Sequence, residues 1–176
     1  EEDDEEALAL LAEAEELDPD NVDFHLIRAD LAEDLDEAIR YARVALEKGK
    51  QLIAPTDFTE GRGMFWMIPE TRPYMRAMWM LADLVWMDGQ QDEALCLYKE
   101  MLDLNFNDNQ GIRYILAVRL LEGGLLEDFE ELLQKFPDDT GTSWLYTKAL
   151  YLFLKEGNSI RAIHALQEAR EANPHI

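Results

Sequence analysis

Apolar residues recur every three or four positions along most of the chain, and alternation with a period of two is nowhere sustained. This spacing places the apolar side chains on one face of a helix, so it predicts amphipathic helices. Short stretches rich in Gly, Asn, Asp and Pro separate the helical segments and supply caps and turns. The predicted helices are residues 7–17, 38–46, 75–87, 94–104, 112–121, 145–154 and 160–169. The pattern therefore predicts an all-α protein whose helices form antiparallel hairpins.

The chain also repeats itself. Residues 89–108 align with the last twenty residues, so that Gly89 meets Gly157 and Ala94 meets Ala162. The offset is 68 residues, which is twice 34. An alanine at such a position lets two helix backbones approach closely, and a glycine permits the left-handed conformation that ends a helix. The repetition predicts a helical repeat protein.

This periodicity resembles that of the tetratricopeptide repeat family, whose 34-residue unit is a helix pair with small residues where the two helices touch. The resemblance implies a single domain built as a right-handed superhelical stack of antiparallel helix pairs, an α-solenoid with one long loop insertion. Residues 75–108 match the family pattern best, although Phe106 stands where the family usually has proline. The predicted units are residues 1–21, 22–50, 75–108, 109–139 and 140–176, with the insertion at 51–72.

Four short motifs narrow the resemblance. They are "TRPYMRA", "NDNQGIRY", the run Tyr146-Thr147-x-Ala149-Leu150 and the terminal "NPH". Together they look like a group of stand-alone bacterial tetratricopeptide proteins that is distantly similar to the suppression-of-tumorigenicity family. That family has no enzymatic mechanism, so the resemblance implies a scaffold.

Both ends of the chain look like cuts through a repeat array. Residues 6–17 resemble the second helix of a pair whose first helix is missing, and the chain stops where another helix would begin. A repeat buries its apolar face only against its neighbours. We therefore expect a fragment of a longer protein, with a tendency to self-associate through its exposed terminal repeats.

The aromatic residues suggest a binding surface. On the segment 75–87, Met78 and Leu81 belong to the face that packs against the partner helix. In the resembled family, the other stripe of this helix lines an inner, concave groove. Aromatic, Met and Arg side chains are enriched at protein interfaces. The predicted groove residues are Arg76, Trp79, Asp83, Trp86, Arg113, Trp144 and Tyr151. We expect them to bind a peptide or a helix of another protein.

The insertion leaves three interpretations open. It is longer than most connections in compact domains, and it contains five consecutive apolar residues at 64–68. These residues would be costly to leave in water, and the aromatic groove is the nearest place for them to dock. The segment could be permanent structure filling part of the groove or the flank of the helix beside it. The two less favoured interpretations are a displaceable lid and an exposed interface.

Composition and charge exclude several classes of partner. The hydrophobic content of 48% is enough for a folded protein, and no apolar run approaches the ~20 residues that span a bilayer. The net charge is −22, and residues 1–40 alone carry seventeen acids and two arginines. Such a field repels nucleic acids, whose binding depends on Lys and Arg. We expect a soluble, cytoplasmic protein that binds neither nucleic acid nor membrane.

No catalytic, metal-binding or cofactor-binding motif is recognisable. The three histidines are scattered, with His25 in one predicted unit and His164 and His175 far apart along another, so they form no metal-binding pair. Cys96 is the single cysteine and is predicted to be buried in a helix. The prediction is a non-enzymatic scaffold with no cofactor. Two alternatives remain: a structural or self-assembly segment of a larger protein, and a metal-dependent hydrolase using groove carboxylates such as Asp83.

Overall fold

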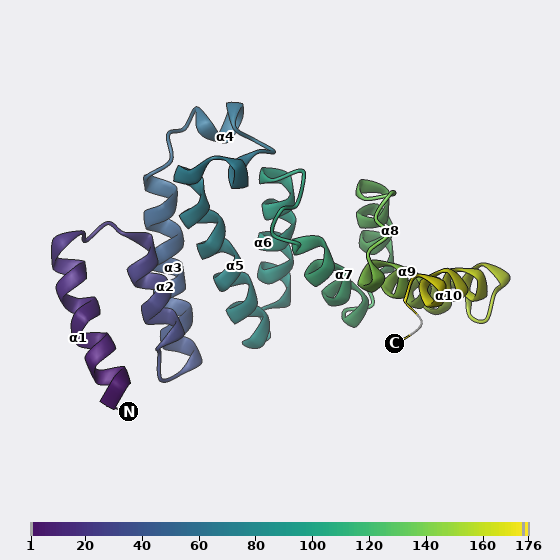
Figure 1. The fold of residues 1–176 in the computed structure, drawn as a ribbon, viewed down its shortest axis with the longest axis horizontal. Helices are drawn as coiled ribbons and strands as arrows, with labels where there is room; N and C mark the ends of the chain where they lie inside the picture. The colour runs from purple at the N-terminus through teal and green to yellow at the C-terminus, as the bar shows by residue number, and fades with distance from the viewer. Residues whose placement is uncertain (1, 174, 176) are drawn as a thin grey trace. The chain divides into compact units, whose positions relative to one another are not determined.

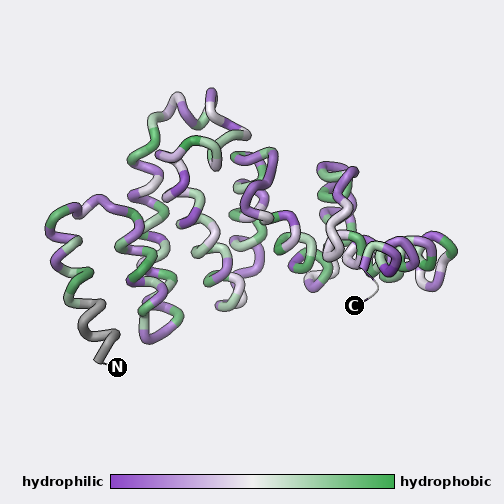
Figure 2. The backbone as a smooth tube through the Cα atoms, viewed as in Figure 1, coloured by the Kyte–Doolittle hydropathy of each residue, from purple (hydrophilic) through white to green (hydrophobic). Residues whose placement is uncertain are grey.

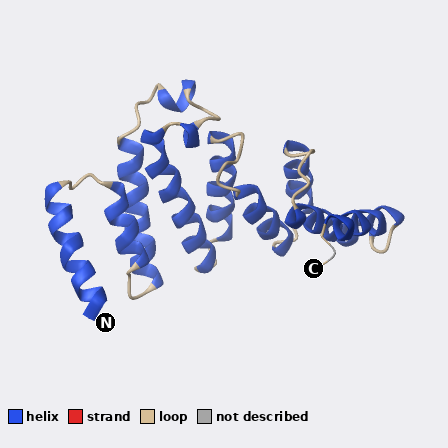
Figure 3. Ribbon diagram, in the orientation of Figure 1, coloured by secondary structure: helices blue, strands red, loops and turns tan. Residues whose placement is uncertain are grey.

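The structure is a computed structural model that describes residues 2–173 and 175, with side chains from residue 9 onward. Within this range the chain forms ten α-helices and two short 3-10 helices, and it contains no β-strand (Figure 3). The prediction of an all-α protein is confirmed. The chain divides into two compact units, residues 1–110 and residues 111–176, which we describe separately.

Unit 1 contains six α-helices and both 3-10 helices in its described part (Figure 1). Their bounds are α1 (Glu2–Leu17), α2 (Val22–Asp30), α3 (Leu35–Gln51), α4 (Asp57–Glu60), η1 (Phe65–Met67), η2 (Pro69–Thr71), α5 (Arg72–Met87) and α6 (Gln91–Leu104). Helix α3 packs against both α2 and α5, and α5 packs against α6. Polar side chains begin two of these helices, since Asn21 accepts a hydrogen bond from the amide of Asp23, and Asp34 one from the amide of Glu37.

Small residues bring the helices of unit 1 together. Ala45 of α3 and Ala77 of α5 are fully buried in one cluster with Val22 and Leu26 of α2. Gly49 lies so close to α5 that a Cβ atom there would be 3.0 Å from the Cα of Tyr74. Hydrophobic and hydrophilic residues interleave along the helices (Figure 2), as expected for helices that bury one face.

The segment between α3 and α5 is folded onto α5 and anchored at several points. The Phe65 ring is fully buried, with its centroid 5.3 Å from that of Phe58. The Thr71 hydroxyl donates a hydrogen bond to the carbonyl of Phe65. The carbonyl of Gly63 accepts one of 2.9 Å from the amide of Phe106. A Cβ at Gly63 would come within 2.3 Å of the Phe106 ring, and the φ of +88° there also favours glycine.

Unit 2 contains four α-helices in its described part, α7 (Ile112–Glu122), α8 (Leu126–Lys135), α9 (Thr142–Glu156) and α10 (Ile160–Ala172). Helix α9 packs against α7, α8 and α10. Aromatic rings of α8 and α9 form a cluster within unit 2. The ring centroid of Phe129 lies 6.3 Å from that of Trp144 and 4.9 Å from that of Tyr151. Aromatic packing of this kind dominates a small core because each ring buries a large area.

Candidate functional site

Unit 1 carries an open groove between α2 and α5, with a volume of about 780 Å³. Its lining combines aromatic, aliphatic and acidic side chains with one arginine. The residues are Asp23, Leu26, Ile27, Ala29, Asp30, Trp66, Arg76, Trp79, Met80, Asp83 and Leu84. A volume of this size falls within the range typical of ligand-binding sites.

Helical spacing explains why these residues share one surface. The α5 residues recur at intervals of three and four, from Arg76 through Trp79 and Met80 to Asp83 and Leu84. Residues at these intervals form one stripe of a helix. The other face of α5, which includes Met78 and Leu81, is buried.

The wall opposite is a similar stripe of α2, formed by Asp23, Leu26, Ile27 and Asp30. Leu26 is buried against α3 and α5, whereas Ile27 remains 45% exposed. The groove therefore has an aliphatic side with acidic groups at both ends of α2.

Trp66 completes the lining from the insertion. The side chain of Arg72 holds this residue in place, because its Nε donates a hydrogen bond of 2.8 Å to the Trp66 carbonyl. Its guanidinium also lies 5.7 Å from the centre of the Trp66 ring, within cation–π range. The insertion thus contributes one residue to the wall of the groove. Its other apolar side chains differ in burial, since Phe65 is buried while Met64 and Met67 are exposed.

The charged residues of the groove are not equivalent. The guanidinium of Arg76 is bound by both carboxylate oxygens of Asp23, with Nη2 at 2.7 and 2.8 Å from them. The carboxylate of Asp83 accepts a hydrogen bond from the Tyr98 hydroxyl of α6. Asp30 is exposed at the end of α2. The single arginine of the lining is therefore paired with Asp23, and the other two aspartates of the lining do not share it.

Three of the seven residues predicted to form the groove line it: Arg76, Trp79 and Asp83. Trp86 lies on the same helix and is partly buried, but it is not part of the lining. Sequence reasoning did not identify the α2 wall. The signal was present in "VDFHLIRAD", where Asp23, Ile27 and Asp30 follow helical spacing.

The other three predicted residues belong to unit 2, and two of them are core residues. Trp144 is 2% exposed and Tyr151 is 3% exposed. The rings of Tyr114 and Phe136 each meet Trp144 edge to face at 6.1 Å, and Phe129 covers both residues. The expectation that these two rings line a groove is wrong, because neighbouring aromatic side chains of unit 2 enclose them.

Arg113 is engaged inside unit 2. Its Nε donates a hydrogen bond of 2.6 Å to Asp139, and its Nη2 donates one of 2.7 Å to the Tyr114 hydroxyl. Burial raises the pKa of Asp139, but the hydrogen bonds from Arg113, the Gly141 amide and Tyr114 outweigh it, and the net pKa is lowered. The expectation that Arg113 lines the groove is wrong, because it is not part of the lining and Asp139 of unit 2 binds its guanidinium.

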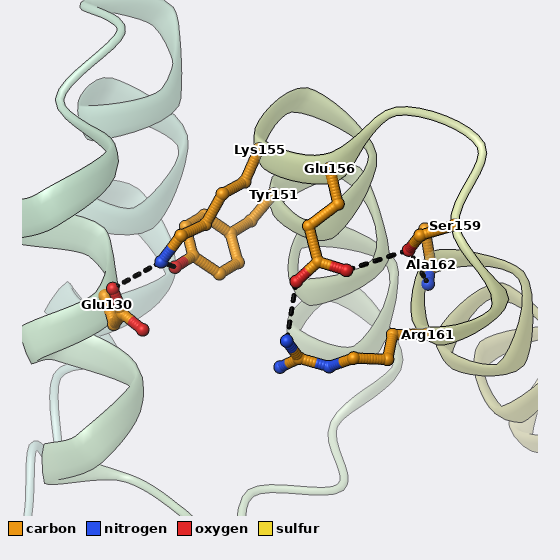
Figure 4. A network of polar contacts seen from close by, with 7 residues as sticks. All are labelled: Glu130, Tyr151, Lys155, Glu156, Ser159, Arg161 and Ala162. Atoms are coloured by element: carbon orange, nitrogen blue, oxygen red, sulfur yellow. Dashed lines mark hydrogen bonds and ion pairs between the residues drawn. The ribbon is translucent and has the colours of Figure 1, made fainter.

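The hydroxyl of Tyr151 is part of a polar network at the edge of unit 2 (Figure 4). Lys155 Nζ donates hydrogen bonds to this hydroxyl at 2.8 Å and to Glu130 at 2.6 Å. The hydrogen bond with Glu130 is the main reason that the pKa of Lys155 is raised. A second group links Glu156 to Ser159 at 2.8 Å and to Arg161 at 2.6 Å. These contacts tie α9 to α8 and to the start of α10.

Other candidate chemistry is sparse in the described part of the chain. No group of three or more His, Cys, Asp or Glu residues is placed there to hold a metal ion. Cys96 is exposed, not buried as predicted. His25 is buried between charged residues of three helices and has no hydrogen-bond partner for either ring nitrogen, and desolvation lowers its pKa. None of the described helices is both long and apolar enough to cross a membrane.

Comparison with known protein families finds no matching family, and comparison with curated proteins finds no similar sequence.

Proposed function

We propose that this chain is a non-enzymatic protein-interaction module that holds a segment of another protein in the groove between α2 and α5. One observation carries the proposal: Trp79, Met80 and Leu84 are only partly buried and share one open groove with Ile27. Exposed aromatic and Met side chains in a concave site are typical of protein-binding surfaces, because rigid rings bury much area for little lost entropy. An apolar stripe of a peptide or helix would cover these side chains.

The proposed architecture is a tetratricopeptide-like stack of antiparallel helix pairs with right-handed superhelical twist. Two features of the repeat support it. Gly89 and Gly157, 68 residues apart, both have positive φ, at 81° and 68°. Ala94 and Ala162, which follow them at the same spacing, are both buried. Equivalent glycines therefore share a positive φ and equivalent alanines share burial, as expected of repeats.

A peptide-binding experiment with matched variants tests the proposed function. A panel of fluorescent amphipathic peptides of about 15 residues, a length at which isolated helices become stable enough to form on contact, is titrated with the protein. Ile27→Asn changes a groove residue that is 45% exposed, and Met87→Asn makes the same kind of change on α5 outside the groove at a residue 70% exposed. We expect Ile27→Asn to weaken binding about tenfold and Met87→Asn to leave it unchanged.

Thermal unfolding monitored by circular dichroism checks that both variants remain folded. Absence of binding for every peptide would overturn the proposed function. Equal weakening by the two variants would show that the peptides do not use the groove.

A second candidate function, self-assembly, is favoured by a different surface. Leu150, Phe153, Ile163 and Leu166 are exposed and line a hollow of about 400 Å³ between α9 and α10. Residues 142–172 carry four basic and three acidic residues, a net charge of +1 in a chain of −22. Two copies of the chain could therefore bring these faces together without the repulsion that other surfaces would meet.

Sedimentation velocity over a range of protein concentrations tests self-assembly. We expect a dimer that Phe153→Ser abolishes and that the control Met87→Ser preserves. A monomer at every concentration would exclude this candidate and would leave the groove proposal intact.

A further inference from the structure

The charges of the groove lining do not balance. It contains three aspartates and one arginine, and the arginine, Arg76, is paired with Asp23. Among the described residues, no cation is paired with Asp30 or Asp83. A segment that fills the groove would remove water from these two carboxylates, and burying an unpaired charge is unfavourable. An occupant that brings a cation avoids this loss.

The position of Asp83 favours a cation at one particular place. Trp79 and Asp83 are four residues apart on α5 and both line the groove, so their side chains are neighbours on one helix face, with Cβ atoms about 6 Å apart. A Lys ammonium or Arg guanidinium between them would contact the carboxylate and an indole ring together. Ion pairing and cation–π attraction would then act on the same group.

Tyr98 of α6 holds the Asp83 carboxylate in a fixed orientation. Its hydroxyl donates to Oδ1 of Asp83 from the side of α6, which fixes the carboxylate without adding positive charge. The hydrogen bond therefore orients Asp83 without bringing a cation to it.

The net negative charge of unit 1 also favours a cationic segment. Residues 1–110 contain 28 acidic and nine basic residues, a net charge of −19, whereas residues 111–176 contain ten acidic and seven basic residues, a net charge of −3. Such a field accelerates the approach of cationic segments and repels acidic ones.

We infer that the groove selects a protein segment whose apolar side chains are interrupted by a Lys or Arg, which binds between Asp83 and Trp79 with Asp30 at the exposed end of the groove. This inference rests on the proposed function, and it adds the charge of the ligand. Segments carrying a carboxylate or phosphate at that place are excluded from the groove.

Three peptides of identical apolar pattern test the selectivity, with Lys, norleucine or Glu at the same central position. Binding is measured by fluorescence anisotropy of the labelled peptides at low and at physiological salt. We expect the Lys peptide to bind about fivefold more tightly than the norleucine peptide, and the Glu peptide to bind most weakly. Salt should weaken binding of the Lys peptide and have little effect on the norleucine peptide.

Variants that each remove one charge show which carboxylate produces the preference for the Lys peptide. Asp83→Asn keeps an acceptor for the Tyr98 hydroxyl and removes only the charge, so it should abolish the preference for Lys without unfolding the protein. Asp30→Asn should reduce the preference by about half. Glu16→Gln is the matched control, because it removes one exposed charge of unit 1 on α1, outside the groove. It should preserve the preference.

The outcomes separate this inference from the proposed function. Equal binding of the Lys and norleucine peptides, both weakened by Ile27→Asn, would overturn the charge selectivity and leave the groove as a binding site. A preference for Lys that Glu16→Gln reduces as much as Asp83→Asn would assign it to net charge and would also overturn the inference. Failure of all three peptides to bind would overturn the proposed function itself.

Discussion

Trp79 on α5 of unit 1 and Trp144 on α9 of unit 2 were both predicted to line a groove, but their environments differ. Trp79 is partly exposed beside an open groove, whereas Trp144 is almost completely buried. The difference lies in the covering elements. Helix α2 presents Ile27, Ala29 and short acidic side chains to α5, and these leave a groove open. The elements around Trp144 present three further aromatic rings and close the space.

The ion pairs of the two units also differ in solvent exposure. The Arg76–Asp23 pair has side chains that are 40% and 48% exposed, and the Arg113–Asp139 pair has side chains that are 18% and 9% exposed. Residue type therefore does not distinguish the lining of an open groove from a core. What distinguishes them is whether the opposing element carries side chains large enough to fill the space.

The largest expected difference is in the free energy of unfolding of the two Trp→Ala variants. Trp144→Ala should lower the free energy of unfolding by about 3–5 kcal/mol, the usual loss for a buried aromatic side chain. Trp79→Ala should lower it by only about 1 kcal/mol, because the indole is partly in water. Urea denaturation followed by circular dichroism measures both. Similar losses would show that Trp79 is as much a core residue as Trp144.

A smaller effect is expected for the ion pairs. Arg113→Met removes the partner of a nearly buried carboxylate and should cost about 3 kcal/mol of stability. Arg76→Met breaks an exposed pair and should cost less than about 1 kcal/mol. The two variants are matched, because each retains an apolar side chain of similar length. A larger loss for Arg76→Met than for Arg113→Met would contradict the assignment of Arg113 to the interior of unit 2.

The smallest expected effect is the pH dependence of stability that His25 gives to unit 1. Burial lowers the pKa of His25, although Glu15 of α1 opposes the shift, while Lys48 of α3 and Arg28 of α2 reinforce it. The unfolded chain therefore binds a proton more readily than the folded one. Stability should be full above the ordinary histidine pKa of about 6.5 and should fall as the pH drops below it.

Urea denaturation at several pH values measures the fall for the natural chain and for His25→Leu. The variant should lose this dependence, and His164→Leu, which changes an exposed histidine of α10, should retain it. A stability that rises as the pH drops below 6.5 would show that His25 becomes charged in the folded protein.

The sequence predicted helices α5 and α6 closely, but it covered only residues 38–46 of the longer α3. The segments 75–87 and 94–104 became α5 and α6, and each extends only three residues before the predicted start. Helices α2 and α8, with nine and ten residues, were implied by the repeat units but had no distinct periodic segment of their own. Short helices complete few turns, so their apolar pattern is weak.

The groove was predicted only in part. Helical spacing correctly placed Arg76, Trp79 and Asp83 on one face of α5, because spacing within a helix depends on local geometry alone. Burial of Trp144 and Tyr151 depends on Phe129, which is 15 and 22 residues away along the chain and packs against them only in the folded unit. Periodicity carries no information on such contacts.

The most direct test uses the indole N–H signals of the four tryptophans, Trp66, Trp79, Trp86 and Trp144, in ¹⁵N–¹H correlation spectra. Single Trp→Phe variants assign the signals, and the Lys-containing peptide is then titrated into the natural chain. The groove account predicts that the signals of Trp66 and Trp79 move with rising peptide concentration and that the signal of Trp144 stays in place. Movement of the Trp144 signal, with those of Trp66 and Trp79 unchanged, would contradict it.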